Sequence, residues 1–361
     1  MKKLTLFIAM LFCAAFNYSA QAIESHTVAC TAGNLAIVTA GYKATVTNLT
    51  VTGTIDARDF KTMQSAMPLL DTIDLSGSTV EAYLGAQGTN GTTFTDYPAN
   101  AIPPFAFHNL STHASKTSLK IFVYPSSITT IGVYAFLGCS GFTGSLIIPS
   151  SVTTIGECAF IDCSGFTGSL SIPSSVTTIG GSAFYACSGL TGSLTIPSSV
   201  TTIGSYAFHS CSGFTSIIAL STTPINIVGS SDVFYNINKT TCILHVPVGS
   251  KSLYAAADQW KNFINIEDGT ITSVNEVSTN SITIFPNPAI SYITVSDLSS
   301  LVNDKTVTLS VTNVSGSTLF TQDVEFSINT LTLDVSSFKS GIYFIAIQTS
   351  NGKVVKRFVK E

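Results

Sequence analysis

The sequence predicts a mainly β protein, in which a solenoid of about 24-residue repeats with short helical turns is followed by a C-terminal immunoglobulin-like β-sandwich. Three observations support this fold class. A segment that begins with proline recurs at a fixed interval in the middle of the chain. Alternating apolar and polar residues precede each proline, as in half-buried strands. After residue 270 the repeat is lost, and short alternating segments separated by turn residues replace it.

The N-terminus has the features of a secretory signal peptide over residues 1–22. Lys2 and Lys3 precede a short apolar stretch from Leu4 to Phe16, and Ala20-Gln21-Ala22 matches the small-x-small pattern of a cleavage site. A buried N-terminal helix is the alternative interpretation. We expect export, with cleavage near Ala22 and delivery to the cell surface or the extracellular space.

The composition favours folded structure and excludes two classes of partner. Hydrophobic residues make up 45% of the 361-residue chain and charged residues 10%, whereas globular domains average about 25% charged residues. Low charge at this hydrophobicity argues against disorder. The net charge of -4 provides no basic footprint for nucleic acid. After the signal peptide no run reaches the ~18 apolar residues of a membrane span, so we expect no transmembrane segment in the mature chain.

The repeat is the strongest signal in the chain. The segment Pro125–Gly132 recurs with its proline at Pro149, Pro173 and Pro197, and each step is 24 residues. A fainter copy around Ile102 precedes these four. Every regular copy continues with an Ala-Phe pair and then a cysteine followed by Ser-Gly. These cysteines are Cys139, Cys163, Cys187 and Cys211.

One unit shows which side chains should form the core. Leu170-Ser171-Ile172 alternates as a half-buried strand does, and Pro173 ends the strand because proline cannot donate to a ladder. A single unit leaves two flat faces uncovered, so units must stack into a solenoid with a cap at each end. A plain parallel β-helix is the alternative. The side chains that we expect to point inward are Leu170, Ile172, Val176, Ile179, Ala183, Phe184, Cys187 and Leu190.

We divide the mature chain into three parts. Residues 23–98 should form an N-terminal cap and the first degenerate repeats, with a strand over residues 69–75. Residues 99–270 should form the solenoid with its C-terminal cap, and residues 271–361 the sandwich. The side chains expected to close the C-terminal cap are Tyr254, Trp260, Phe263 and Ile266.

The repeat resembles the BspA-like leucine-rich-repeat family. The family unit places an apolar residue three positions after a cysteine, followed by an Ile-x-Ile-Pro strand, a Val/Ile-x-x-Ile-Gly segment and Ala-Phe. Residues Ile102 to Leu220 match this pattern closely, and the segments Leu49 to Phe107 and Cys242 to Ile266 match the flanking segments more loosely. The resemblance implies a leucine-rich-repeat solenoid in a surface or secreted protein that binds a partner, and some members of the family are implicated in adhesion to host proteins.

One departure from the family concerns the length of the unit. The family unit is usually one residue shorter than the 24 residues found here. We expect the extra residue near Gly144, Gly168 and Gly192, as a glycine bulge just before each strand.

The C-terminal segment has a different period. From about Val274, short alternating stretches are separated by turn residues, including Pro286-Asn287-Pro288 and Asn351-Gly352. Asn-Gly between two strands is a strong hairpin signal, and six or seven strands in this length suggest a sandwich. The expected strands are Ile282 to Phe285, Tyr292 to Ser296, Val307 to Val311, Leu331 to Val335, Ile342 to Ile347 and Val354 to Val359.

This segment also resembles a known family, the type A C-terminal sorting domain of type IX secretion. The matching motifs are Phe285-Pro286-Asn287-Pro288, Gly341-Ile342-Tyr343-Phe344 and the basic ending Lys353 to Glu361, in the order of the family. The resemblance implies that the type IX secretion machinery is a partner, that the domain directs passage across the outer membrane, and that it is usually removed. An ordinary immunoglobulin-like module is the alternative. The sorting-motif residues are Pro286, Asn287, Pro288, Gly341 and Tyr343.

Catalytic signatures are absent from the sequence. There is no Walker loop, no G-x-G-x-x-G and no G-x-S-x-G. The five histidines lack zinc-like spacing, and the closest pair, His108 and His113, has no acidic partner pattern. Glu157 and Asp162 are the only acids between Pro125 and Leu220, and we expect both to face solvent. We therefore predict no enzyme activity, no cofactor and no metal site.

The cysteine ladder invites a disulfide or ligand interpretation because the chain is exported. Stacked turns would bring successive Cα atoms to about 5 Å, which is within disulfide range. The side chains would all point the same way into the core, however, so we expect reduced, buried cysteines that serve packing. Cys30 and Cys242 should also remain unpaired because a solenoid places them at opposite ends.

The polar strand positions are the candidate binding surface. The first and third residues of each short strand face away from the core, and a merely solvated face is the alternative. Threonine pairs at 129–130, 153–154, 177–178 and 201–202 form further ladders, for which ice binding is a remote possibility. Asp71-Thr72-Ile73 weakly resembles an O-glycosylation motif. The candidate residues are Ser145, Ile147, Ser169, Ser171, Ser193 and Thr195.

These observations predict a non-enzymatic, cell-surface or secreted binding protein that acts in adhesion or protein–protein interaction. The expected partner is a host extracellular protein or another microbial surface protein. Two alternatives stay open: a structural protein of the cell surface or matrix without a specific ligand, and a hydrolase of unrecognised type. If the strand face does not bind, the less regular segment Glu81 to Asn100 is the next candidate.

Overall fold

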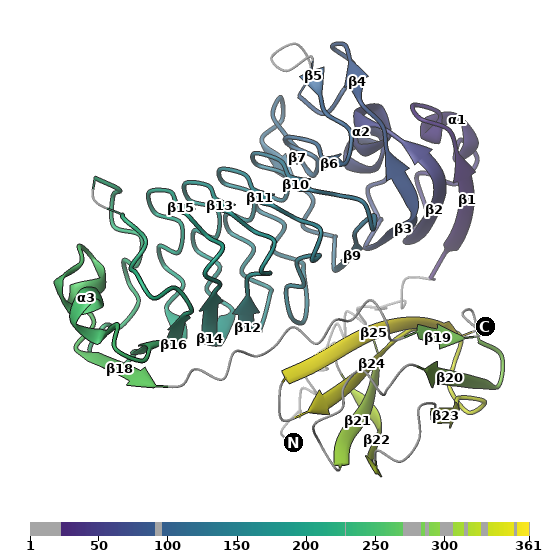
Figure 1. Ribbon diagram of the computed structural model, residues 1–361. Coiled ribbons are helices and arrows are strands. Elements are labelled where there is room, and N and C mark those ends of the chain that lie inside the picture. The colour runs from purple at the N-terminus through teal and green to yellow at the C-terminus, as the bar shows by residue number, and fades with distance from the viewer. Residues whose placement is uncertain are drawn as a thin grey trace, which may run out of the picture.

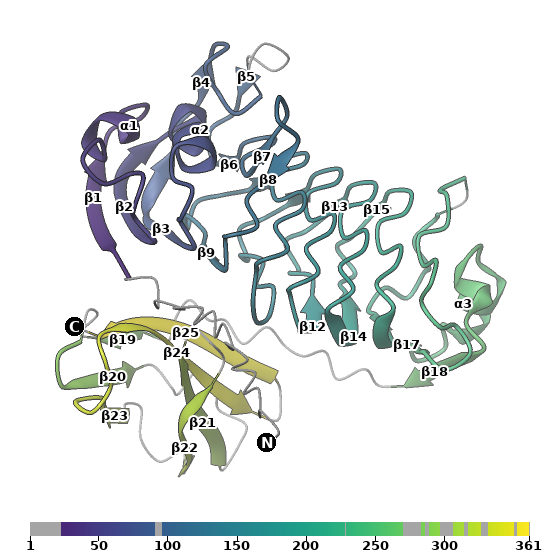
Figure 2. The same ribbon diagram turned by 180° about the vertical axis from the view of Figure 1, so that it is seen from behind.

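The computed structural model describes residues 23–90, 96–227, 229–269, 283–285, 289–296, 306–313, 317–325, 331–349 and 352–360. The expected signal peptide and Pro286-Asn287-Pro288 lie outside these ranges. Figure 1 shows an elongated stack of chain turns that runs from β1 to β18, with a separate β-sandwich beneath the first half of the stack. Figure 2 gives the same arrangement from behind.

A four-stranded parallel sheet opens the stack, in the order β1-β2-β3-β9. The strand expected over residues 69–75 begins later, at Thr72, and continues to Val80. Two helices connect the first three strands and pack on the same core. The elements are β1 (Ser25–Cys30), α1 (Leu35–Val38), β2 (Asn48–Ile55), α2 (Ala57–Ser65), β3 (Thr72–Val80) and β9 (Ile121–Val123).

Short strands fill the chain between β3 and β9. Two of them form a small antiparallel pair, β4 with β5, and two others pair as β7 with β8. The bounds are β4 (Tyr83–Leu84), β5 (Asp96–Tyr97), β6 (Ala101–Ile102), β7 (His108–Asn109) and β8 (Ala114–Ser115).

The repeats contribute to two parallel sheets on different sides of the coil. One sheet has the order β15-β13-β11-β10-β6, and the other has the order β12-β14-β16-β17-β18. In the first sheet Ile131 pairs with Ile155 and Ile155 with Ile179, so the register follows the 24-residue step. The strands of the first sheet are β10 (Thr130–Ile131), β11 (Thr154–Ile155), β13 (Thr178–Ile179) and β15 (Thr202–Ile203). Those of the second are β12 (Gly168–Ser171), β14 (Leu190–Ile196), β16 (Gly213–Ala219), β17 (Ile243–Pro247) and β18 (Asn265–Gly269).

A continuous apolar core fills the coil, and the predicted solenoid is confirmed. The eight inward side chains expected in one unit are all buried, with at most 2% of each exposed. A column of phenylalanine rings runs along the axis, in which Phe136, Phe160, Phe184 and Phe208 stack with ring centroids 5.3–5.4 Å apart. Burial of such rings is a large favourable contribution to folding, and only stacking of neighbouring turns achieves it.

The predicted glycine bulge is also confirmed. Gly168 and Gly192 have φ values of +79° and +76°, and the strand register shifts immediately after each of them. A different column of glycines is required by close packing. A Cβ on Gly165 would lie 2.1 Å from the Phe142 carbonyl oxygen, and a Cβ on Gly180 would lie 2.4 Å from the Glu157 amide nitrogen.

The cysteines of the ladder are buried and free, as predicted, and so are Cys30 and Cys242. Three ladder thiols donate to a phenylalanine carbonyl of the preceding turn: Cys163 to Phe136 at 3.1 Å, Cys187 to Phe160 at 3.0 Å and Cys211 to Phe184 at 3.0 Å. Each of these carbonyl oxygens also accepts from a backbone amide of its own turn. The thiol therefore adds a second hydrogen bond inside the core while packing as a small apolar group.

Aromatic side chains close the C-terminal end of the core. Tyr254 and Trp260 are each 1% exposed and meet edge to face at 5.3 Å, and Trp260 also packs on Phe234. The Trp260 indole nitrogen donates to the Ile225 carbonyl oxygen at 3.0 Å, which satisfies its only donor. Helix α3 (Lys251–Ala256) and the 3-10 helix η1 (Trp260–Asn262) hold these rings.

The C-terminal segment forms two antiparallel sheets, with the orders β19-β20-β23 and β22-β21-β24-β25. Strands β24 and β25 pair as the hairpin predicted from Asn351-Gly352, with Thr349 opposite Gly352; residues 350 and 351 themselves lie outside the described residues. Sequence analysis missed β22, whose mixture of polar and apolar residues lacks clear alternation. The strands are β19 (Thr283–Phe285), β20 (Tyr292–Ser296), β21 (Thr306–Asn313), β22 (Thr318–Glu325), β23 (Leu331–Asp334), β24 (Gly341–Thr349) and β25 (Gly352–Lys360).

Candidate binding surface

The outer face of the sheet β12-β14-β16-β17-β18 presents a row of small polar side chains. Alternation along each strand directs Leu170 and Leu194 into the core, where both are 0% exposed. Their neighbours Ser171 and Thr195 pair in register on the outside. The structure therefore brings four of the six predicted residues onto one face: Ser169, Ser171, Ser193 and Thr195.

The row continues beyond the predicted residues. Thr195 pairs with Ile218, Ile218 with His245, and His245 with Glu267. The His245 Nδ1 atom lies 3.6 Å from the Glu267 carboxylate. Sequence analysis missed these three residues because the spacing becomes irregular after Leu220. The alternation in Ile243–Pro247 is the signal that could have extended the row.

Hydroxyl groups on this face are ordered along the stack. The Ser193 hydroxyl donates to the Ser169 hydroxyl oxygen at 3.2 Å, and the Ser193 amide donates to the same oxygen at 3.1 Å. The Thr215 hydroxyl donates to the Gly192 carbonyl oxygen at 3.2 Å. A serine hydroxyl has one donor and two acceptor positions. These contacts hold the hydroxyl groups in place, and part of their hydrogen-bonding capacity remains for a partner.

Ser145 and Ile147 do not join this row, and their prediction as strand residues is wrong. The turn begins in register, because the Thr143 amide donates to the Lys120 carbonyl oxygen and the Gly144 carbonyl oxygen accepts from Thr167. Among the described residues, however, 145–148 pair with neither β9 nor β12. We call residues 145–148 the strand gap. Ile147 is 56% exposed there.

The size of the neighbouring side chains accounts for the strand gap. Phe122 and Tyr124 of the preceding turn occupy the inward positions that Leu146 and Ile148 occupy in the next. Both rings pack against Phe136, at 5.1 and 6.0 Å. Aromatic rings need more room than Leu and Ile in a close-packed core. They hold the following segment away from β9.

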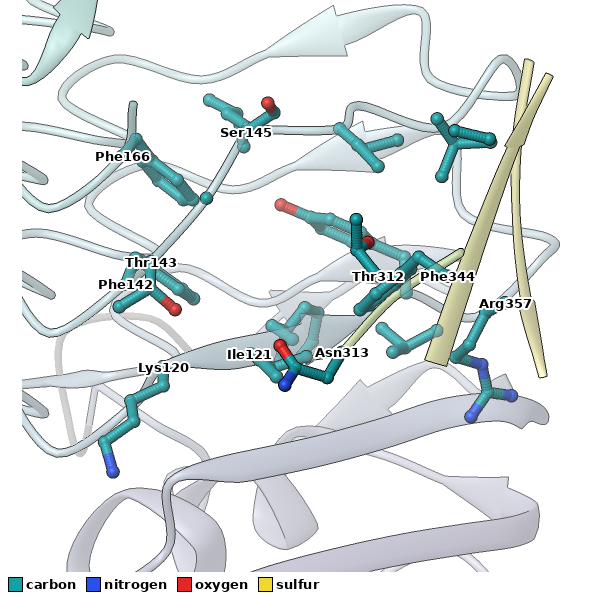
Figure 3. Close-up of a pocket in the computed structure, with 18 of the residues that line it drawn as sticks. Lys120, Ile121, Phe142, Thr143, Ser145, Phe166, Thr312, Asn313, Phe344 and Arg357 are labelled. Carbon is teal, nitrogen blue, oxygen red and sulfur yellow. The ribbon is translucent and has the colours of Figure 1, made fainter. Parts of the chain in front are cut away.

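A cavity of about 460 Å³ lies at the strand gap, between the solenoid and the sandwich. Figure 3 shows Ile121, Phe142 and Ser145 on the solenoid side, with Thr312, Phe344 and Arg357 reaching it from the sandwich. The guanidinium of Arg357 pairs with the Asp74 carboxylate and donates to the Ser76 hydroxyl oxygen at 3.0 Å. Lys120, which also lines the cavity, pairs with Asp71 at 2.9 Å. The cavity lining is therefore mainly apolar, and two of its residues form ion pairs.

An aromatic column lies on another side of the coil. The rings of Tyr185, His209 and Tyr235 stack at 4.5 Å intervals, and Tyr206 meets His209 edge to face at 5.6 Å. Sequence analysis did not single out this column, although each member directly follows the inward phenylalanine of its turn. Stacking uses the ring faces within the column, so mainly ring edges remain for contact with other molecules.

The threonine ladders lie on the sheet opposite the candidate surface. Thr130, Thr154, Thr178 and Thr202 pair in register. In the adjoining row, the Thr153 hydroxyl donates to the Thr129 carbonyl oxygen at 3.2 Å, and Thr177 and Thr201 repeat this contact at 3.3 Å. These hydroxyl donors are used inside the protein, which argues against an array that orders water.

The perturbed titratable groups belong to the core. Burial lowers the pKa of Lys116 to about 8, and its ammonium donates to the Met67 carbonyl oxygen at 2.6 Å. Burial raises the pKa of the nearby Cys139 thiol to about 12. Burial also raises the pKa of Asp59, which accepts from the amides of Gly33 and Leu35. Each of these shifts favours the neutral form. For Cys139 this disfavours the nucleophilic thiolate, and the Lys116 side chain is buried in the core with its amine held by the Met67 carbonyl oxygen.

Histidines and acids do not form a cluster in the described parts of the chain. The His108 Nδ1 atom lies 2.9 Å from the Ser115 hydroxyl, and burial together with the neighbouring His113 lowers the pKa of His108. Glu157 and Asp162 are exposed, as predicted. Within the ranges that the structure describes, no three His, Cys, Asp or Glu side chains are close enough to share a metal ion.

Two of the five predicted sorting-motif residues lie in described strands. Gly341 begins β24. Tyr343 is 6% exposed, stacks on Phe358 at 5.5 Å, and donates from its hydroxyl to the Lys339 carbonyl oxygen at 2.7 Å. Both residues therefore shape the sandwich core and its entry turn. Pro286, Asn287 and Pro288 lie outside the described residues.

Comparison with protein families gives two matches. Residues 102–241 match the BspA type leucine rich repeat region in six copies. Residues 283–361 match the secretion system C-terminal sorting domain. Curated proteins gave no match. None of the helices in the described residues has the length and apolar character that crossing a membrane would need.

Three solved structures are similar to parts of the chain. A leucine rich repeat protein of T. pallidum is 25% identical, with 40% of this chain and 65% of that one covered and a TM-score of 0.28. A leucine-rich repeat protein of Bacteroides ovatus is 20% identical, with 49% and 57% covered and a TM-score of 0.28. A DUF3244 family protein of Bacteroides vulgatus with an immunoglobulin-like β-sandwich fold is 20% identical, with 22% and 85% covered and a TM-score of 0.19. The chain thus spans less than two thirds of the two repeat proteins.

Proposed function

We propose that this chain, which belongs to the BspA type leucine-rich-repeat proteins and carries a secretion-system C-terminal sorting domain, is an exported, non-enzymatic protein that binds a protein partner. The binding surface is the outer face of the sheet β12-β14-β16-β17-β18. The partner is a host extracellular protein or another microbial surface protein, which makes adhesion the biological role.

The observation that carries the proposal is the register of the outer row. Ser171, Thr195, Ile218 and His245 stand side by side on adjacent strands. Neighbouring strands lie about 4.8 Å apart, so the row forms a flat, rigid platform of small groups. The hydrogen-bonded sheet already fixes the backbone that carries these side chains, so binding a partner costs less conformational entropy. A protein surface can approach it closely and exchange hydrogen bonds and apolar contacts with it.

The charge pattern favours a protein partner over an acidic polymer. No Lys or Arg occurs between Pro125 and Leu220. Counterion release from a polyanion needs basic side chains, and electrostatic steering also depends on net local charge. We therefore expect the affinity to change little between low and physiological salt.

In this proposal the N-terminal and C-terminal segments direct delivery to the cell surface. Residues 1–22 supply a signal peptide with cleavage near Ala22, and residues 271–361 supply the domain that the type IX secretion machinery recognises. The basic final strand and the motif residues Pro286, Asn287, Pro288, Gly341 and Tyr343 are the expected points of recognition. Deletion of residues 271–361 should leave the protein in the periplasm of its host.

The experiment that tests binding uses the mature chain, residues 23–361, with Ser171→Arg and Thr195→Arg combined. Two long cationic side chains on the platform should block close approach and weaken binding to a panel of host extracellular-matrix proteins by about tenfold or more. Surface plasmon resonance gives the affinity. The melting temperature should not change, because Leu170 and Leu194 stay in place.

The matched control introduces the same charges on the opposite sheet, as Thr154→Arg with Thr178→Arg. This variant should bind as the parent does. Unchanged binding by the Ser171/Thr195 variant with an unchanged melt would place the site elsewhere, first at Glu81 to Asn100. Absence of saturable binding to every protein tested would favour the structural role instead.

A further inference from the structure

We propose that the outer face of the four-stranded sheet β22-β21-β24-β25 docks on the strand gap of the solenoid, so that each covers the apolar surface of the other for as long as the C-terminal domain is attached. The solenoid therefore carries a second surface, distinct from the polar platform, that becomes accessible when the domain is removed. This inference does not depend on a partner at the platform, and either can fail without the other.

The sandwich contributes an apolar patch on the outer side of β24 and β25, formed by Phe344, Ala346 and Val355. Alternation along β24 directs Tyr343 and Ile345 into the sandwich core and places Phe344 and Ala346 on the opposite side. The outer face of an antiparallel sheet is normally polar because water covers it. Ala346 is only 5% exposed on that face, and it lines the cavity at the strand gap. The apolar character of this face is accounted for by docking.

The solenoid contributes a matching apolar surface. Ile121 and Val123 of β9 and Ile147 of the strand gap line the same cavity. Elsewhere on the strand face the corresponding positions carry Ser171 and Thr195. Among the described turns 121–219, the stretch of the strand face that lacks ladder pairing thus lies against the sandwich and carries apolar residues, of which Ile147 remains 56% exposed.

An ion pair fixes how the two surfaces meet. The Arg357 guanidinium lies in the same cross-strand row as Phe344, and it pairs with Asp74, whose side chain is 4% exposed. In Figure 3 the Arg357 side chain extends from its strand toward the N-terminal sheet. A buried charge needs its partner, because a lone charge without water is strongly unfavourable. The pair therefore admits one docked arrangement and disfavours shifted ones.

The charge of the docking strand, and not the net charge of the domain, is complementary to the solenoid. Residues 23–270 contain 8 Lys and Arg against 13 Asp and Glu, and residues 271–361 contain 6 against 7. Strand β25 has four basic residues and no acid, namely Lys353, Lys356, Arg357 and Lys360. Attraction between the two parts is therefore local, and Arg357 with Asp74 is its contact. The cavity of about 460 Å³ shows that the surfaces are not fully interlocked. Such an interface holds while the two parts are covalently linked and releases when they are separated.

The experiment measures the labelling rate of a cysteine introduced on the covered face of the full mature chain. Every native cysteine in residues 23–361 is buried, so background labelling by a bulky maleimide is low. The Ala346→Cys variant should label slowly, and Gln348→Cys, at an exposed position of the same face, should label fast. Adding Arg357→Glu to Ala346→Cys should accelerate its labelling by about tenfold or more, as expected when a buried charge pair is broken. The exchanged pair Asp74→Arg with Arg357→Asp should restore protection.

Two controls separate undocking from unfolding. Lys339→Glu makes the same charge change at an exposed position of the domain and should leave Ala346→Cys protected. Ile345→Cys, which points into the sandwich core, should stay unlabelled when Arg357→Glu is present. Fast labelling of Ala346→Cys in the parent chain, or labelling that is indifferent to Arg357→Glu, would overturn the proposal. Failure of the exchanged pair to restore protection would also contradict it, because the pair would then not determine docking.

Discussion

Two stretches of the same solenoid share an inward phenylalanine column and differ in their outer strands. In the regular turns, residues 168–219, the outer strands form a continuous parallel ladder. Around the strand gap, the inward Phe136 and Phe160 are buried as fully as Phe184. The parallel ladder of the outer strands is nevertheless interrupted there. The comparison teaches that the inward side chains alone define the coil. The ladder tolerates unequal side chains, since Ile196 pairs with Ala219 and Ile73 with Phe122. We attribute its interruption at the strand gap to the two inward rings of the preceding turn, Phe122 and Tyr124, because backbone spacing is set by what lies between the backbones.

The same difference separates two kinds of surface. A continuous ladder satisfies its own amides and carbonyls, and it presents small polar side chains to solvent. An interrupted ladder leaves apolar side chains such as Ile147 exposed and requires a cover. In the two proposals made above, the regular turns provide the platform for a partner, and the turn with the strand gap provides the docking surface for the C-terminal domain.

The largest effect should come from the shared core. Phe184 is 0% exposed and stacks between Phe160 and Phe208 at 5.4 Å on both sides. Phe184→Ala should lower the free energy of unfolding by about 3–5 kcal/mol, because it removes a ring and leaves a cavity in a rigid stack. Urea denaturation followed by circular dichroism measures the loss.

The comparison residue for this change is Phe122 at the strand gap. It is only partly buried against the core, so Phe122→Ala should cost less than half as much. Equal losses at the two positions would show that the strand gap is packed as tightly as the regular turns.

Much of the fold could be predicted because it depends on local pattern. Periodicity identified the eight inward side chains of a unit, and the extra glycine identified the bulge at Gly168 and Gly192. Strand β22 was missed because its alternation is weak. The strand gap was missed for a different reason. Its cause is the volume of Phe122 and Tyr124 in the preceding turn, which no pattern within the repeat 125–149 reveals.

The candidate surface was predictable to the extent that the repeat is regular. Ser169, Ser171, Ser193 and Thr195 could be placed on one face by counting along strands. Ile218 and His245 could not be, because their register depends on an irregular connection after Leu220. The contact between Arg357 and Asp74 joins residues far apart in the sequence, and no spacing rule links two separate folding units.

A smaller effect should distinguish the cysteines of the two stretches. The Cys187 thiol donates to the Phe160 carbonyl oxygen at 3.0 Å, whereas the described structure shows no such contact for Cys139. Cys187→Ala should cost about 0.5–1.5 kcal/mol for the lost hydrogen bond, because the Phe160 carbonyl oxygen still accepts from the Cys163 amide. Cys139→Ala should cost less, and Cys187→Ser should recover part of the loss. An equal cost for both alanine variants in urea denaturation would mean that the thiol contributes through its volume alone.

The buried cysteines of the ladder should also make the free energy of unfolding depend on pH. Burial raises the pKa of Cys211 to about 12 in the folded protein, while a thiol in an unfolded chain ionises near ~8.5. The neutral thiol is favoured by folding, so its stabilisation is complete below about pH 8.5 and decreases as the pH rises toward 12. The Cys211→Ala variant should lose stability less steeply than the parent over this range.

The smallest change in stability, and the sharpest test of the comparison, comes from exchanging side chains at the strand gap. Phe122→Leu with Tyr124→Ile gives β9 the inward residues of the next turn, Leu146 and Ile148. Volume and patterning remain close to those of the regular repeats, so the free energy of unfolding should change by less than about 1.5 kcal/mol.

The structural consequence should be larger than the energetic one. With smaller side chains behind it, the segment 145–148 can approach β9 and form ladder hydrogen bonds, and its amides should then exchange with deuterium more slowly than in the parent. The reciprocal variant, Leu170→Phe with Ile172→Tyr, should spread the regular turns and speed exchange in β14, because overpacking displaces the backbone. Mass spectrometry of the peptides that contain residues 145–148 and 190–196 records both effects. If exchange in the strand gap stays fast in the first variant, side-chain volume is not what interrupts the ladder, and the docked sandwich becomes the cause of the interruption instead of its consequence.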